Sequence, residues 1–206
     1  MVQAAGADPT DTMTRGQIKD HVIAMAERHV AACESYSSLK TDASKNLAVW
    51  IGDEQGAYLT VCTMDAPGLT VDDFKAFYHP DSLCDNMKIL DKIITARKIE
   101  NVGGELDANM YTIYQHVKTP MIASNRCCFM CVHNIDMPDG SFVHMSTSKG
   151  NKALEEANVA LKAKDVLSHC WMTYNKIEAK ADGSGCRITT VICVDASGSL
   201  PGMIKK

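Results

Sequence analysis

From residue 91 onward, turn residues divide the chain into six segments of extended character, and this division limits the fold more than any other feature. The dividing residues include Pro-Asp-Gly at 138–140 and Asp-Gly-Ser-Gly at 182–185. Consecutive strands that are joined by tight turns pair antiparallel. We therefore expect an antiparallel meander formed by residues 91–102, 108–118, 126–136, 141–148, 166–179 and 186–195.

The first 90 residues predict helices and a hairpin. Apolar side chains at helical spacing, among them Ile18, Val22 and Met25, indicate a helix that extends from a Thr12 or Thr14 cap to about residue 35. The other expected elements are a hairpin of residues 47–52 and 57–64, helices at 71–78 and 81–90, and an ambiguous segment at 152–164. Together they predict an α+β helix-grip domain, in which a curved antiparallel sheet wraps around helices and leaves a hollow.

Charge and hydropathy argue against several classes of protein. The net charge of −4 at pH 7 lacks the basic excess expected of a nucleic-acid-binding protein. The sequence has no run of 18 apolar residues, and its polar first residues do not match a signal peptide. We expect a cytoplasmic protein without nucleic-acid partners, with a frayed segment at 1–11 and one domain at 12–206.

The nine cysteines favour free thiols over a disulfide framework. Cys128 and Cys131 have the spacing of a zinc or redox pair, but residues three apart on a strand point to opposite faces. We expect these two and Cys127 to be core or wall side chains. Phosphate loops, dinucleotide fingerprints, nucleophile elbows and zinc-protease motifs are missing from the sequence. We therefore expect a protein without a catalytic residue, metal or cofactor.

Two motifs resemble the START domain, the lipid-transfer domain related to the steroidogenic regulator and the phosphatidylcholine carrier. Val-Lys-Thr-Pro-Met-Ile-Ala-Ser-Asn-Arg at 117–126 is similar to the family's strand, proline-containing loop and signature, here Asn125 and Arg126. Val-Asp-Ala-Ser-Gly-Ser-Leu-Pro at 194–201 is similar to the run after the family's last strand. Their order and separation of about 70 residues also fit, so the resemblance covers residues 12–206.

The resemblance implies a carrier that holds one lipid in a tunnel beneath the curved sheet. It also implies a gate loop that contains Pro120, Met121 and Ile122, whose apolar tip is expected to contact a membrane transiently. The implied tunnel wall consists of strand residues that share one face. These residues are Tyr111, Ile113, Gln115, Cys128, Met130, Val132, Trp171, Thr190 and Ile192. The alternative that they fill a solid core stays open.

Departures from the family pattern leave the ligand open. The aromatic residues that surround choline in the phosphatidylcholine carrier correspond to Gln115 and Cys128. The buried acid and arginine of the steroid carriers correspond to Ile113 and Val132. Neither kind of headgroup recognition therefore transfers to this sequence.

We predict noncatalytic binding and transfer of one hydrophobic or amphipathic lipid, such as a phospholipid, a sterol or a fatty acyl lipid. Two alternatives stay open. One is an enzyme of the related Bet v 1-like fold, with a side chain such as Tyr111 as acid or base, and the other is a lipid-sensing scaffold module. Because the sequence stops at Lys206, we expect the family's C-terminal lid helix to be short or absent, with self-association or a partner covering the tunnel mouth.

Overall fold

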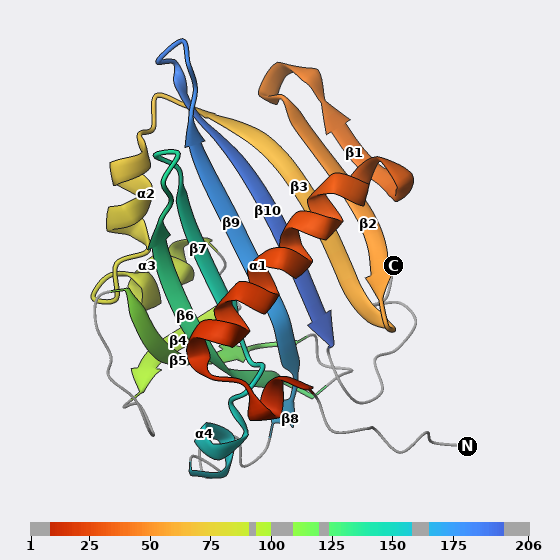
Figure 1. Cartoon of the computed structure of the whole chain (residues 1–206), viewed down its shortest axis with the longest axis vertical. Helices are drawn as coiled ribbons and strands as arrows, with labels where there is room; N and C mark the ends of the chain where they lie inside the picture. Colours follow the sequence, from red (N-terminus) through yellow and green to blue (C-terminus); the bar gives the residue numbers. More distant parts are fainter. Residues whose placement is uncertain (1–8, 91–93, 100–108, 120–123, 158–164, 196–206) are drawn as a thin grey trace.

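The computed structural model describes residues 9–90, 94–99, 109–119, 124–157 and 165–195. Within them the chain forms one curved sheet in the order β1-β2-β3-β10-β9-β7-β6-β5-β4, with β8 paired to β6 (Figure 1). The strands are β1 (Ser37–Asp42), β2 (Leu47–Glu54), β3 (Ala57–Pro67), β4 (Ile94–Ile99), β5 (Met110–Val117), β6 (Arg126–Asp136), β7 (Phe142–Thr147), β8 (Val166–Leu167), β9 (His169–Ala179) and β10 (Gly185–Asp195). The α-helices are α1 (Arg15–Ala32), α2 (Val71–Phe77), α3 (Leu83–Leu90) and α4 (Lys152–Ala157).

Two meanders build this sheet. Strands β1, β2 and β3 form the first, and the strands from β4 to β10, apart from β8, form the second. Helices α2 and α3 lie between the two meanders in the sequence and carry the chain to the far edge of the sheet at β4 (Figure 1). The second meander then returns until β10 pairs with β3, where Val191 lies opposite Val61. This long-range pairing joins the two meanders.

The structure confirms the predicted meander, the hairpin and the helix-grip fold class. Strand β1 was not predicted, because five of its six residues are exposed and the strand lacks an alternating pattern. The predicted strand at 166–179 is divided, since β8 pairs in parallel with β6 before β9 pairs with β7. The ambiguous segment begins with the helix α4. The frayed segment predicted at 1–11 is wrong for its last three residues, because Pro9–Thr12 form a 3-10 helix in which Thr10 is buried and accepts a hydrogen bond from the Met13 nitrogen. Residues 1–8, and residues 196–206 where a short lid was predicted, lie outside the described residues.

Helix α1 covers one face of the sheet, which we call the α1 face, and crosses β9, β10 and β3 (Figure 1). Thr14 caps the helix, because its hydroxyl accepts from the Gln17 main-chain nitrogen at 3.3 Å, and Gln17 Oε1 accepts from the Thr14 nitrogen at 2.9 Å. Ile18, Val22 and Met25 are buried against the sheet. Burial of one such side chain stabilises the fold by about 1.5–3 kcal/mol. None of the described helices is long and apolar enough to span a membrane.

Helices α2 and α3 pack on the opposite face, which we call the α2–α3 face. Phe142 and His144 of β7 contact the ring of Tyr78 at the end of α2. Val143 and Met145 alternate with them and pack in the α1 cluster. Since successive side chains of a strand point to opposite faces, the helices cover the sheet from both sides.

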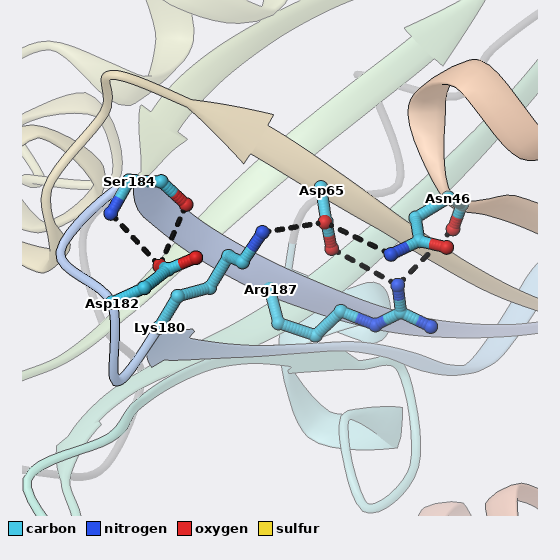
Figure 2. A network of polar contacts seen from close by, with 6 residues as sticks. All are labelled: Asn46, Asp65, Lys180, Asp182, Ser184 and Arg187. Carbon is cyan, nitrogen blue, oxygen red and sulfur yellow. Dashed lines mark hydrogen bonds and ion pairs between the residues drawn. The ribbon is translucent and has the colours of Figure 1, made fainter.

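A polar network around Asp65 links the end of β3 to the neighbouring strands (Figure 2). Asp65 accepts hydrogen bonds from Lys180 at 2.9 Å, from Arg187 at 3.0 Å and from Asn46 at 3.1 Å. The hydrogen bonds from Lys180 and Arg187 hold the pKa of Asp65 well below its usual range. The network therefore joins β3 to β10, to the end of β9 and to the turn before β2.

Candidate ligand-binding site

A cavity of about 200 Å³ lies between the two short helices and the α2–α3 face of the sheet. The helical side contributes aromatic and apolar groups, and the strands contribute most of the polar ones. The lining residues are Phe77, Tyr78, Leu83, Met87, Ile113, Gln115, Met130, His144, Ser146, Thr173 and Asn175. Among these described residues there is no aspartate, glutamate, lysine or arginine, so the cavity favours an apolar or neutral molecule.

Tyr78 attaches the end of α2 to three strands. Its ring stacks on His144 of β7, with ring centroids 3.8 Å apart and an interplanar angle of 10°. Its main-chain oxygen accepts hydrogen bonds from the Tyr111 hydroxyl of β5 at 2.9 Å and from Asn134 Nδ2 of β6 at 3.0 Å. Burial raises the pKa of the Tyr78 hydroxyl to about 12, so it stays protonated at neutral pH. These contacts hold one side of the cavity in place.

The partners of His144 determine its protonation. Asn134 donates through its nitrogen to Tyr78, so its amide oxygen faces His144 Nδ1, at 2.9 Å. This oxygen is an acceptor, and Nδ1 must therefore carry the proton. Burial lowers the pKa of His144 to about 3, which leaves the ring neutral at pH 7. The Nε2 atom then has a lone pair, and no described residue hydrogen-bonds to it.

Asn175 lies directly opposite His144 in the pairing of β9 with β7. Its Oδ1 accepts a hydrogen bond from the Thr190 hydroxyl at 2.8 Å, which directs its Nδ2 elsewhere. The side chain is 8% exposed, and within the described ranges its Nδ2 has no hydrogen-bond partner. Two neighbouring residues of the cavity lining therefore carry an available acceptor, on His144, and an available donor, on Asn175.

Beyond α2 and α3 the same face continues over β2, β3 and β10. Four large apolar side chains there are between 38% and 42% exposed. We call these four, Ile51, Tyr58, Met64 and Ile192, the apolar strip. Ile192 lies opposite Thr173, which lines the cavity. Ile192 and Ile51 both pair with Thr60. The strip is therefore adjacent to the cavity on one surface.

Eight of the nine predicted wall residues lie on the α2–α3 face. Those that line the cavity are Ile113, Gln115 and Met130. Those that are buried in the apolar cluster beside it are Tyr111, Cys128 and Val132. Those on β10 are Thr190, which bonds to Asn175, and Ile192 of the apolar strip. That any of them contacts a ligand stays a prediction.

Trp171 does not join this predicted wall, because it packs against the α1-face cluster. The reason is an irregularity in the pairing of β9 with β10. Cys193 lies opposite Met172, whereas the next residue, Val194, lies opposite Cys170. Trp171 is therefore an extra residue on β9, and such a β-bulge changes the face on which the following side chains lie.

The signature residues make local contacts. Asn125 Oδ1 accepts from the Thr119 nitrogen at 3.2 Å, and the buried Arg126 donates to the carbonyl oxygen of Ser124. The bond between Thr119 and Asn125 joins the two sides of the segment predicted as a gate, whereas the bond from Arg126 lies within one side. The predicted gate residues themselves, Pro120, Met121 and Ile122, lie outside the described residues.

No disulfide joins the cysteines in the described part of the chain, and Cys127, Cys128 and Cys131 are buried. Cys128 packs in the cluster beside the cavity, and Cys127 packs in a separate cluster with Tyr114 and Phe129. Adjacent thiols therefore lie on opposite faces of β6, as alternation requires. In the described part of the chain, no group of three or more His, Cys, Asp or Glu side chains is placed to hold a metal ion.

Three residues at the cavity, His144, Asn134 and Asn175, are not indicated as site residues by any sequence pattern. Each lies in a segment that was correctly predicted to be a strand. The available signal was the alternation of His144 and Ser146 with Val143 and Met145 on β7. Both sets contain apolar or small residues, so alternation alone does not tell which set lies beside the cavity.

Solved structures show which known fold this is. Human StAR-related lipid transfer protein 5 has a TM-score of 0.67 at 14% identity, over 93% of this chain and 88% of that one. Human STARD10 has a TM-score of 0.61 at 17% identity, over 86% and 69%. The lipid transfer and protein localization domain of human StarD13 has a TM-score of 0.59 at 14% identity, over 90% and 88%.

This chain therefore has the fold of the START, or StAR-related lipid transfer, domains. The resemblance seen in the two sequence motifs is confirmed as a likeness of fold. No protein-family model matches the sequence. No curated protein matches it either.

Proposed function

We propose that this protein is a noncatalytic lipid-binding protein that holds one amphipathic lipid on its α2–α3 face and transfers it between membranes. One observation carries the proposal: the cavity beneath α2 and α3 is adjacent to the apolar strip on the same face. Exposed apolar surface of this kind, next to a cavity, is typical of a ligand-binding groove. The likeness to domains that are named for lipid transfer supports the same function.

The size of the cavity and the position of the apolar strip suggest how a lipid would lie on the α2–α3 face. The cavity of about 200 Å³ is smaller than typical ligand pockets, which enclose roughly 300–1,000 Å³. It has room for one end of a lipid, and the hydrocarbon part would extend along the apolar strip. Each methylene that is removed from water contributes about 0.8 kcal/mol, so a tail gains from contact with Ile192 and Ile51.

The environment of the aromatic and imidazole groups supports binding rather than acid–base catalysis. The hydroxyl of Tyr111 is bonded to the main-chain oxygen of Tyr78, and burial raises its pKa above the ordinary value. His144 is neutral throughout the physiological range, because burial lowers its pKa to about 3. A general acid or base works best with a pKa near the operating pH.

The proposal is tested by native mass spectrometry of the purified protein and by transfer of fluorescent lipids between vesicles. The variant Ile192→Arg places a charge on the apolar strip and should reduce transfer about tenfold or more, since an alkyl chain would then lie against a charge. Leu39→Arg is the matched control, because Leu39 is also a large exposed apolar residue, at 64%, but lies outside the strip on β1.

We expect the control variant to transfer lipid at the wild-type rate, and both variants to unfold at the wild-type temperature. Equal transfer by the two variants would remove the strip from the proposal. Wild-type protein that purifies without lipid and transfers none of the phospholipids, sterols and fatty acyl lipids offered to it would refute the proposed function.

A further inference from the structure

Two residues that line the cavity each carry a buried polar atom for which no described residue supplies a hydrogen-bond partner. The first is Nε2 of His144, which is an acceptor because Asn134 fixes the proton on Nδ1. The second is Nδ2 of Asn175, which is a donor because Thr190 occupies Oδ1. Both side chains are more than nine-tenths buried. Buried polar groups in proteins are nearly always hydrogen-bonded, so these two atoms indicate a ligand that supplies the missing bonds.

The two atoms are close enough to meet one functional group. His144 and Asn175 are direct neighbours across β7 and β9 and point to the same face. Side chains in such positions have Cβ atoms about 4.5–5.5 Å apart. A hydroxyl group matches the pair, because it donates one hydrogen bond and accepts another.

The other lining groups argue against a charged end. No charged side chain lines the cavity among the described residues, and the other polar residues on the strands, Gln115, Ser146 and Thr173, are neutral. Phosphate, carboxylate or ammonium groups would be buried there without a counter-charge, which costs much more than burying a neutral hydroxyl.

We infer that the cavity binds the uncharged hydroxyl end of a lipid, whose O–H donates to His144 Nε2 and whose oxygen accepts from Asn175 Nδ2. The inference rests on the proposed function, because it assumes that the α2–α3 face binds a lipid. It assigns the ligand to the class of hydroxyl-bearing neutral lipids, which includes long-chain alcohols, sterols and diacylglycerols, and excludes charged phospholipids and ionised fatty acids.

The test compares three probes with the same tail: dodecan-1-ol, dodecyl methyl ether and dodecanoate. Their affinities are measured by displacement of a fluorescent alkyl probe. The ether oxygen can accept from Asn175, but the ether has no proton for His144. We therefore expect the alcohol to bind about tenfold or more tightly than the ether, and dodecanoate to bind more weakly than the alcohol.

Two variants separate the roles of the side chains. His144→Phe should abolish the preference for alcohol over ether, while His144→Gln, whose amide oxygen lies near the position of Nε2, should retain most of it. Asn175→Leu should lower the affinities for the alcohol and for the ether by the same factor, because both probes carry the oxygen that accepts from Asn175. Near-UV circular dichroism verifies that each variant is folded.

The outcomes distinguish the inference from the proposed function. If the wild-type protein binds alcohol and ether equally, or binds dodecanoate most tightly, the inference is wrong and lipid binding stands. If it binds no probe and purifies without lipid, the proposed function fails and the inference fails with it. The same comparison of cholesterol with its 3-methyl ether distinguishes a ring system from an alkyl chain.

Discussion

The two faces of the sheet each bury a histidine, and the two histidines differ in their hydrogen-bond partners. Beside the α1 face, His29 is 3% exposed, and both of its ring nitrogens have partners: the Tyr36 hydroxyl at 2.8 Å and the Glu54 carboxylate at 3.3 Å. On the α2–α3 face, His144 is 4% exposed, and among the described residues only its Nδ1 has a hydrogen-bond partner, Asn134. Buried polar groups in a protein core are nearly always hydrogen-bonded, so this difference agrees with the ligand site that we propose on the α2–α3 face.

Packing differs between the faces in the same way. On β3 and β10, Val61 and Val191 are fully buried under α1. On the opposite face of the same strands, Met64 and Ile192 are exposed. Strands that are apolar on both faces are typical of sheets covered on both sides. Among the described residues, α1 covers these strands on one face, whereas part of the α2–α3 face is left exposed.

The largest expected difference between the faces concerns stability. Met145 is fully buried in the α1 cluster, so Met145→Ala should lower the free energy of unfolding by about 2–5 kcal/mol. Met130 lines the cavity, and its packing is already incomplete. Met130→Ala should therefore cost less, and it should change lipid affinity, which Met145→Ala should not. Urea unfolding of both variants measures the difference, and equal costs would contradict the contrast between the faces.

Met130→Arg tests the comparison of the two faces through lipid binding. It would place a charge in the cavity without a partner and should abolish loading with lipid. Native mass spectrometry of the folded variant measures the loading. Normal loading would show that the ligand does not occupy this side of the sheet.

A smaller effect is expected on the pH dependence of stability. Burial lowers the pKa of His144 to about 3 in the folded protein, whereas the unfolded chain takes up this proton near pH 6.5. The unfolded state therefore binds more protons as the pH falls, and acid favours unfolding. Between pH 7.5 and pH 5, this histidine should remove about 2 kcal/mol of stability.

The variant His144→Gln tests this value. Its free energy of unfolding should fall by about 2 kcal/mol less than that of the wild type between pH 7.5 and pH 5. Urea unfolding at the two pH values measures it. Burial also lowers the pKa of His29, so a remaining slope of the same sign is expected in the variant. A variant with the same slope as the wild type would show that His144 is not held neutral.

The smallest expected effect concerns thiol labelling on opposite faces of neighbouring strands. Cys62 of β3 is half-buried and pairs with Thr190 on the α2–α3 face. Cys193 of β10 is buried under α1, and burial raises its pKa to about 12. Iodoacetamide should therefore modify Cys62 before Cys193, and bound lipid should slow the reaction of Cys62 several-fold.

Peptide mass spectrometry identifies the modified residue. Earlier modification of Cys193 would contradict the assignment of faces. An unchanged rate at Cys62 in the presence of lipid would show that the ligand does not extend over this part of the sheet.

Local patterns predicted a large part of the fold. A predicted cap at Thr12 or Thr14 and the spacing of Ile18 and Val22 identified α1, and turn residues such as those at 138–140 separated the strands. These signals act over a few residues, which is why the sequence alone contains them. The resemblance to the START family, and not alternation alone, placed Ile113 and Met130 of two different strands on one face.

Two features of the site were not accessible in this way. Trp171 lies on the other face because a bulge shifts the register of β9 against β10, and a bulge of this kind depends on the partner strand. His144 and Asn175 become neighbours through the pairing of β7 with β9, although 30 residues separate them in the sequence. Their hydrogen-bond partners likewise come from β6 and β10.

The sequence by itself determined where most of the strands and helices lie and, away from the bulge at Trp171, which side chains of one strand share a face, since both depend on contacts between near neighbours in the chain. The tertiary structure decided which face α1 covers, which face keeps a cavity, and which buried polar atoms have no partner among the described residues. These properties depend on register and on packing between distant segments, and no local pattern encodes them.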